Sequence, residues 1–176
     1  MDQMDPVSRA ETVWTIREYV AADLQQVYHV HDLARVMELA SGGVDAQAFR
    51  PMKEVADIDE FFVSKTLVAC VATDIVGFVS WNGDYISWLY VNPDYHRRGI
   101  GRRLLREALG RIGPEAWTNM LEGNEPALAL YREAGMQIVS ARPSDCEGYA
   151  CTGLRLALPT SRMRDPAANR PTYDKA

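Results

Sequence analysis

The chain has 176 residues, a length that suits one compact domain with its own hydrophobic core. Hydrophobic residues make up 47% and charged residues 24%, the balance of a globular protein and not of a disordered or fibrous one. The formal net charge of -5 disfavours nucleic acid as a partner, unless a local basic patch overrides the field of the whole protein.

The cysteines and the N-terminal stretch favour a cytoplasmic protein. Three cysteines form no Cys-x-x-Cys pair, and an odd number does not suit a disulfide framework. Cys146 and Cys151 have no histidine or further cysteine nearby to complete a metal site, so no metal is expected and both are interpreted as packing residues. No window approaches the roughly 20 apolar residues that span a bilayer, so no membrane association is expected.

Composition divides the chain into a folded domain and two tails. Residues 1–12 and 159–176 are rich in Asp, Arg, Pro, Ser and Asn and lack apolar periodicity. We expect both to be mobile tails around one folded domain that spans residues 13–158.

The first half of that domain predicts a strand and then two helices. Trp14–Val20 reads as the strand, and Asp23 is placed to cap a helix that continues through Met37. Ser41-Gly42-Gly43 ends this helix. A short helix is expected to begin within Asp57–Phe62.

A meander of three strands follows, and it is the central prediction about the fold. Leu67–Val71 is an almost continuous apolar run, typical of a strand covered on both faces. Ile75–Trp81 reads as the second strand and Tyr85–Val91 as the third. Asn82-Gly83 lies between them, a dipeptide that favours a two-residue hairpin turn. The second and third strands should therefore pair antiparallel.

The remainder alternates helices and strands. The apolar residues of the next helix recur at helical spacing, and a glycine followed by proline ends it. In order, we expect a helix over Leu104–Ile112, a strand over Ala116–Leu121, a helix capped by Asn124 and closed by Gly135, and strands over Met136–Ala141 and Tyr149–Leu158 joined by a polar loop.

Between the third strand and its helix lies a glycine loop that suits phosphate. Arg97–Arg102 places two glycines where unpaired amides and the positive end of a helix converge, with arginines as charged donors. A Rossmann fingerprint would need a third glycine where the chain has Leu104, and a P-loop would need a Gly-Lys-Ser/Thr ending. The loop therefore favours a diphosphate in a different kind of fold.

At these residues the chain resembles the GNAT superfamily of N-acetyltransferases. Trp88–Leu105 is similar to the segment that carries the signature Arg/Gln-x-x-Gly-x-Gly/Ala, and Asn124–Met136 is similar to the later Asn-x-x-Ala-x-x-x-Tyr-x-x-x-Gly-Phe segment. His96 stands where the family has Gln or Arg, and Met136 replaces Phe. The resemblance implies an α+β, GNAT-type acyl-CoA N-acyltransferase fold, with a central, mostly antiparallel mixed sheet of about seven strands and flanking helices.

The resemblance also implies an activity and a cofactor site. It implies transfer of the acetyl group of acetyl-CoA to a primary amine by direct attack, with the pantetheine arm between strands that part near Val91 and Leu121. The cofactor-binding residues that it implies are Leu89, Tyr90, Val91, Arg97, Arg98, Gly99, Ile100, Gly101, Arg102, Asn124 and Tyr131.

Two catalytic roles are considered. Tyr131 matches the family's tyrosine that protonates the departing thiolate, whereas its spacing alone favours simple packing on a helix face. Relatives place a glutamate where this chain has Ser87, so the base is left open among Asp84, His31 and Glu38, each acting through a water relay.

Other assignments stay open at this point. The segment from His31 to Glu38, with Asp32 and Arg35, reads either as an acceptor site for an amine or as a solvated salt-bridged face. The acceptor is a small-molecule or a protein amine. A homodimer through the last strand is possible. The alternative function is a non-catalytic acyl-CoA-binding sensor or interaction module.

Overall fold

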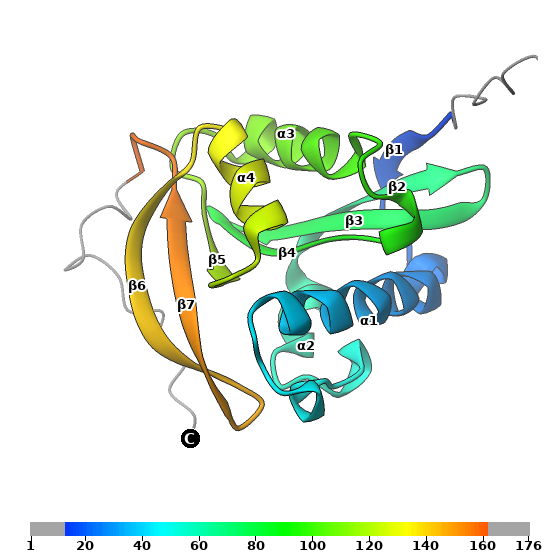
Figure 1. The fold of residues 1–176 in the computed structure, drawn as a ribbon. Helices are drawn as coiled ribbons and strands as arrows, with labels where there is room; N and C mark the ends of the chain where they lie inside the picture. Colours follow the sequence, from blue (N-terminus) through cyan, green and yellow to red (C-terminus); the bar gives the residue numbers. More distant parts are fainter. Residues whose placement is uncertain (1–12, 162–176) are drawn as a thin grey trace, which may run out of the picture.

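The computed structural model describes residues 13–161, which form one seven-stranded sheet with the strand order β1-β2-β3-β4-β5-β7-β6 (Figure 1). All neighbouring strands pair antiparallel except β4 and β5, which are parallel. In chain order the elements are β1 (Thr15–Glu18), α1 (Leu24–Ser41), α2 (Ile58–Val63), β2 (Lys65–Val71), β3 (Asp74–Asn82), β4 (Tyr85–Val91), α3 (Ile100–Ile112), β5 (Trp117–Leu121), α4 (Glu125–Glu133), β6 (Gln137–Cys146) and β7 (Tyr149–Ala157).

This architecture confirms the expected α+β fold with a mostly antiparallel mixed sheet and flanking helices. The tail expected at residues 1–12, and residues 162–176 of the other one, lie outside the described residues. Within residues 13–161, no helix combines the length and the apolar character that crossing a bilayer requires.

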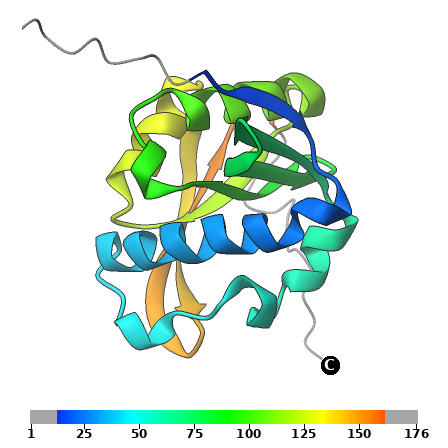
Figure 2. The ribbon, with the colours of Figure 1, turned by 90° about the vertical axis from the view of Figure 1, so that its right-hand side faces the viewer.

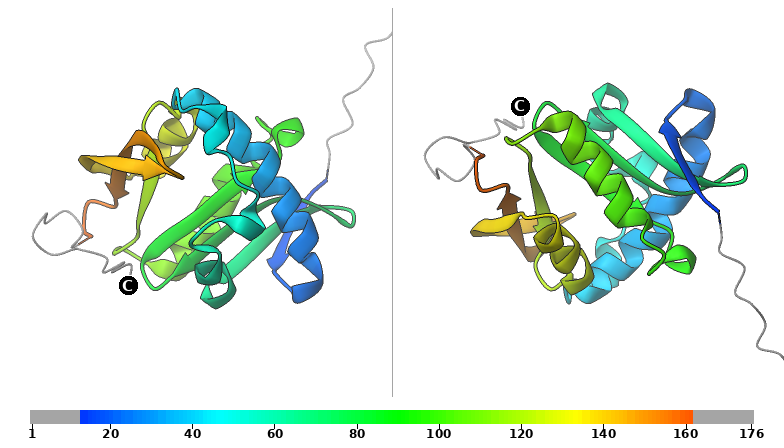
Figure 3. Two further views of the ribbon diagram at one scale, coloured as in Figure 1. Left: turned by 90° about the horizontal axis from the view of Figure 1, so that it is seen from below. Right: turned by 90° about the horizontal axis from the view of Figure 1, so that it is seen from above.

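The helices cover both faces of the sheet. In Figure 1, α3 and α4 lie on one side of the sheet and α1 and α2 on the other; Figure 2 shows α1 crossing the molecule below the strands, and the two views of Figure 3 show the two faces in turn. β2 is buried on both faces, as its apolar run predicts: Leu67 and Ala69 pack toward α3, whereas Val68 and Cys70 pack toward α1.

A bulge in β4 changes which side chains face each layer. Ile86 pairs with Trp81 and Trp88 pairs with Ser80, so Ser87 is the extra residue of the ladder. Before the bulge Ile86 packs with the α3 layer; after it, Trp88 packs with the α1 layer. The bulge therefore places Trp88 and Tyr90 on the α1 side of β4, the side opposite to Ile86.

Two expected turns differ from the structure. The β3–β4 hairpin pairs Asn82 with Tyr85, so its loop is Gly83-Asp84 and not Asn82-Gly83, because the one positive φ it needs falls on Gly83 (56°). The polar loop expected after Ala141 is instead strand up to Cys146, followed by a tight turn. That segment lies on the exposed edge strand, where polar residues and a proline are tolerated.

Helix α1 also begins differently from the expectation. Asp23 precedes it as expected, but the carboxylate makes no side-chain cap bond. It accepts hydrogen bonds from both Nη atoms of Arg17, at 2.6 and 2.8 Å, and from the main-chain N–H of Val20. Asp23 therefore links the first strand to the helix start.

Candidate active site

Strands β4 and β5 part after only two residue pairs. Tyr85 pairs with Trp117 and Ile86 with Thr118, and there the ladder ends. The Thr118 hydroxyl donates to the carbonyl O of Ile86 over 2.8 Å, at the last pair. Beyond this point, the edge of β4 from the bulge to Val91 has no β5 partner. Main-chain N–H and C=O groups on an opened edge are ready to pair with an extended ligand.

The N-terminus of α3 lies at the open end of these strands. Gly99 precedes the helix with φ 79°, and Arg97 has φ 62°. The N–H of Arg103 is the first to bond within the helix, to Gly99 O at 3.0 Å, so the preceding amides have no intrahelical acceptor. A Cβ added to Gly99 would meet nothing within 4 Å, so its backbone conformation and not crowding requires glycine. The predicted phosphate loop thus has the geometry of an anion site.

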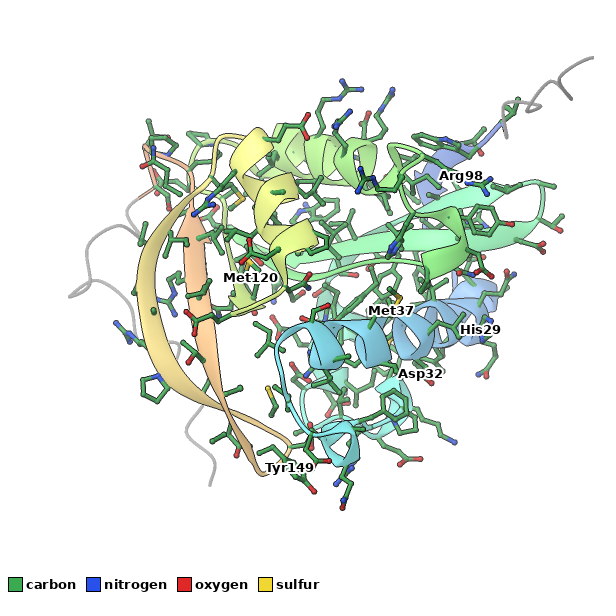
Figure 4. The ribbon with its side chains drawn as sticks, in the orientation of Figure 1. His29, Asp32, Met37, Arg98, Met120 and Tyr149 are labelled. Carbon is green, nitrogen blue, oxygen red and sulfur yellow. The ribbon has the colours of Figure 1, made fainter. Side chains whose placement is uncertain are left out.

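The side chains of this loop are held by local contacts. The Arg98 guanidinium lies 4.9 Å from the centroid of the Tyr95 ring and donates to Asp94 O, and Figure 4 shows Arg98 beside the turn that joins β4 to α3. Arg102 pairs with Glu133 across to α4. His96, which departs from the family pattern, uses Nε2 to donate to Val91 O over 2.9 Å. Its imidazole therefore fixes the loop onto the end of β4.

Tyr131 lies beside the point where the strands part. It is 6% exposed, and burial raises its pKa well above the ordinary value, an effect that the neighbouring Thr118 hydroxyl partly offsets. Its helix begins at Asn124, whose side chain accepts from the main-chain N–H of Ala127, so the predicted cap is confirmed. The phenol is thus a protonated group held inside the protein at the point where β4 and β5 part after Ile86 and Thr118, which we call the fork.

Glu38 faces the fork from α1, on the opposite layer. Its Oε2 accepts from the Tyr90 hydroxyl over 2.9 Å and from Arg35 Nη1 over 2.7 Å. Burial and the Glu38 carboxylate hold the pKa of Tyr90 well above its usual value. The same carboxylate lies near enough to Tyr131 to contribute to its raised pKa. The structure therefore brings Glu38, Tyr90 and Tyr131 together.

Of the other two candidates for the base, His31 is buried beside Tyr90, and Asp84 lies at the closed end of the strand pair. His31 is 1% exposed, bonds Asp32 through Nδ1, and packs edge-on against the rings of Trp88 and Tyr90. Burial lowers the pKa of His31, so it is a neutral core residue and not a group open to an incoming amine. Asp84 occupies the β3–β4 turn, where its carbonyl accepts from Trp117 N at the closed end of the strand pair.

The structure adds residues that the sequence did not single out. Thr118 closes the fork, and its only signal was one hydroxyl in an apolar strand. Trp88 is the first paired residue past the bulge, and its Nε1 is the one buried side-chain nitrogen or oxygen within residues 13–161 without a hydrogen-bond partner. The hydrogen bond of Thr118 and the position of Trp88 after the bulge both depend on the pairing of the strands, which the sequence does not show.

Comparisons with known proteins agree with this geometry. Residues 60–137 match the family model described as the acetyltransferase (GNAT) domain. Peptidyl-lysine N-acetyltransferase YjaB of Escherichia coli K12 is 34% identical over 82 residues, covering 47% of this chain and 55% of the relative. N-alpha-acetyltransferase RimI of Mycobacterium tuberculosis is 49% identical over 53 residues, 30% of this chain and 34% of the relative. The chain thus spans about half the length of the first of these curated relatives.

A solved structure gives the same result for the fold. A GCN5-related N-acetyltransferase from Rhodopseudomonas palustris superposes with a TM-score of 0.65 at 21% identity, covering 82% of this chain and 95% of that chain. The chain therefore has a GNAT-type fold, and its residues 60–137 match the acetyltransferase (GNAT) domain.

Proposed function

We propose that this protein is an acetyl-CoA-dependent N-acetyltransferase that moves the acetyl group to a primary amine. The observation that carries the proposal is the convergence of three features. An opened strand edge, the free amides of α3 and the buried Tyr131 hydroxyl border one region between β4 and β5. A sheet that merely packs would continue the β4–β5 ladder.

The residues present fit acetyl-CoA. The amides that open α3, with positive φ at Arg97 and Gly99, form a cradle for the diphosphate, and the loop arginines supply positive charge beside it. The opened edge over Leu89–Val91 suits the amides of the pantetheine arm. When bound, acetyl-CoA would supply an acetyl group activated as a thioester. Asn124, whose side chain caps α4, is proposed to contact the cofactor as well.

Tyr131 is the proposed proton donor. Its Oη holds a proton at neutral pH, because burial raises its pKa. A thiolate formed in the same desolvated place would also have a raised pKa, so the phenol and the thiol stay comparable in acidity. Proton transfer from Oη would then neutralise the departing sulfur.

Glu38 is the proposed group for the acceptor's ammonium. Its two hydrogen bonds, to Tyr90 and Arg35, both end on Oε2 and hold the carboxylate in place. We assign Oε1 to bind the ammonium and to accept its proton, directly or through water. This choice among Glu38, His31 and Asp84 rests on position, since Glu38 bonds the Tyr90 hydroxyl and its charge acts on Tyr131.

Peptide amines are the first acceptors to test. The relatives named above are called peptidyl-lysine and N-alpha-acetyltransferases, and both names denote amines of proteins. An assay over a panel of acceptors distinguishes modification of a lysine, an N-terminus and a small amine. A homodimer through the last strand and a cytoplasmic location stay predictions of the sequence.

The test separates binding from chemistry. Calorimetry with acetyl-CoA should give a measurable affinity, and thiol release over a panel of peptide lysines, peptide N-termini and small amines should show turnover with one class. Tyr131→Phe should lower kcat by about 10²–10⁴-fold at similar acetyl-CoA affinity, whereas Tyr28→Phe, a change near the start of α1, should keep the wild-type rate. Binding without turnover on any amine would sink the transferase and leave a binding module.

A further inference from the structure

Two cysteines meet in the hairpin of β6 and β7. The register pairs Ser144 with Cys151 and Cys146 with Tyr149, so the two cysteines lie diagonally across the hairpin on one face of the sheet. The Cys146 thiol donates to Sγ of Cys151 over 2.6 Å. Both are free thiols, as is Cys70. Packing alone does not require two thiols in direct contact.

The thiol pair packs against the end of α1, the helix that carries Glu38. We call this the acceptor side of the site, because Glu38 is the group proposed to bind the ammonium. The hairpin rests on the end of α1 and the segment after it, where Cys146 packs with Leu39 and Ala48. Figure 4 shows Tyr149 at the tip of the hairpin, and its hydroxyl lies 3.4 Å from Gln47 Oε1. The Arg35 guanidinium interacts with the Cys146 sulfur, which lowers the pKa of that thiol against stronger opposing effects.

Arg35 connects these thiols to the fork. Its Nη1 donates to Glu38 Oε2, the same oxygen that accepts from Tyr90. A chain of contacts therefore runs from Cys151 through Cys146 and Arg35 to Glu38. A change at the thiols would therefore alter the surroundings of Arg35, which bonds the carboxylate.

We propose that Cys146 and Cys151 form a modification site, at which hydrogen peroxide converts the thiol pair into an intramolecular disulfide that restrains the acceptor-side wall. The disulfide would join the hairpin to itself beside Arg35, while the glycine loop and α3 lie away from it. The reduced and oxidised forms would thus differ on the acceptor side of the fork.

The reaction balances in two steps. Cys151 is the more accessible of the two, so it reacts first: its sulfur takes one oxygen from the peroxide, giving a sulfenic acid and water. The Cys146 sulfur then attacks the Cys151 sulfur, forming the S–S bond and expelling the hydroxyl, which leaves as water with the Cys146 proton. Burial and the adjacent Cys151 raise the pKa of Cys146 to about 12, which also makes Cys146 the second thiol to react.

Mass spectrometry of the full chain tests the proposal. Trypsin does not cut between Arg142 and Pro143, so Cys146 and Cys151 fall in one peptide, Glu133–Arg155, without Cys70. After peroxide treatment and alkylation, this peptide should have lost two hydrogens and carry no alkyl group; dithiothreitol should restore two alkylation sites. Cys151→Ser should abolish the loss of two hydrogens, and Cys70→Ser should keep it.

A second measurement is independent of catalysis. Amide hydrogen exchange in the hairpin should slow by at least about threefold on oxidation of the wild type and not of Cys151→Ser, whereas the affinity for acetyl-CoA should stay within about twofold. Oxidation of Cys151 alone to higher acids, or a disulfide without altered exchange, would overturn the proposal. Both readouts stand even if the amine transferase assignment fails.

Discussion

Thr118 and Ile86 form the last residue pair of the β4–β5 ladder, and the Thr118 hydroxyl donates to the carbonyl O of Ile86 over 2.8 Å. Thr118 is 2% exposed, so this carbonyl has little access to water. The side chain adds a second donor to this carbonyl at the last pair of the ladder. The fork is therefore closed by one side-chain hydrogen bond.

Replacing that hydroxyl should destabilise the protein. Thr118→Val keeps the shape but leaves one lone pair of the buried Ile86 carbonyl without its donor, so the free energy of unfolding should fall by about 1–3 kcal/mol. Thr118→Ser keeps a hydroxyl and is the matched control, which should lose only the cost of one buried methyl group, about 1 kcal/mol. Urea denaturation measures both. If the serine variant lost more stability than the valine variant, the hydrogen bond would not be what closes the fork.

Gly99, before α3, and Gly110, inside it, offer a matched pair of substitutions. Gly99 has φ 79°, so Gly99→Ala should cost about 1–2 kcal/mol of stability and weaken acetyl-CoA binding by moving the amides. Gly110 lies inside the helix, and a Cβ there meets nothing within 4 Å. Gly110→Ala should therefore stabilise by about 0.5–1 kcal/mol. Thermal melts and calorimetry with acetyl-CoA measure the pair; equal effects on acetyl-CoA affinity would contradict the loop assignment.

The sequence predicted the meander, the glycine loop and the helix capped by Asn124 because their signals are local. The positive φ at Gly99 and the cap at Asn124 depend on residues within one turn. The β6 strand was missed beyond Ala141 because an edge strand has polar side chains and reads as a loop. Burial, which decides a strand's pattern, comes from the tertiary structure.

The candidate site divides in the same way. Tyr131 was found through its segment's resemblance to the family, and the structure places it beside Thr118. The sequence could not decide among Glu38, His31 and Asp84. The choice depends on which side chains of β4 lie on the α1 face after the bulge at Ser87. The bulge puts Tyr90 opposite Glu38, and residues distant in the chain then meet.

Glu38 should affect the acceptor and spare the cofactor. Glu38→Gln keeps the size of the side chain and removes the charge proposed to bind the ammonium, so kcat/KM for the amine should fall by at least about tenfold while acetyl-CoA affinity changes little. Glu54→Gln, at an exposed position of the turn Met52–Glu54, is the control and should behave as wild type. Steady-state kinetics with the best acceptor gives the answer. Loss of acetyl-CoA affinity in Glu38→Gln would assign the residue to the cofactor half of the site.

The buried His31 should make stability depend on pH. Burial lowers its pKa below the ordinary 6.5, although hydrogen bonding to Asp32 partly opposes this. Below pH 6.5 the unfolded chain therefore binds a proton that the folded protein resists, so the stability present above 6.5 falls as the pH falls toward the lowered value. The pKa of Asp23 lies below its ordinary 3.8, so its contribution is lost only at lower pH.

Urea midpoints between about pH 7.5 and pH 5 isolate the His31 contribution. The wild type should lose stability over this range as the pH falls, because protonating His31 requires a charge between the rings of Trp88 and Tyr90. His31→Gln, which has no titrating group, should be less stable at pH 7.5 but show a flatter profile. His29→Gln, at an exposed position on the same helix, should keep the wild-type slope. A wild-type slope in His31→Gln would mean that another group governs stability in this range, and that His31 is not held neutral by the packing of α1 on β4.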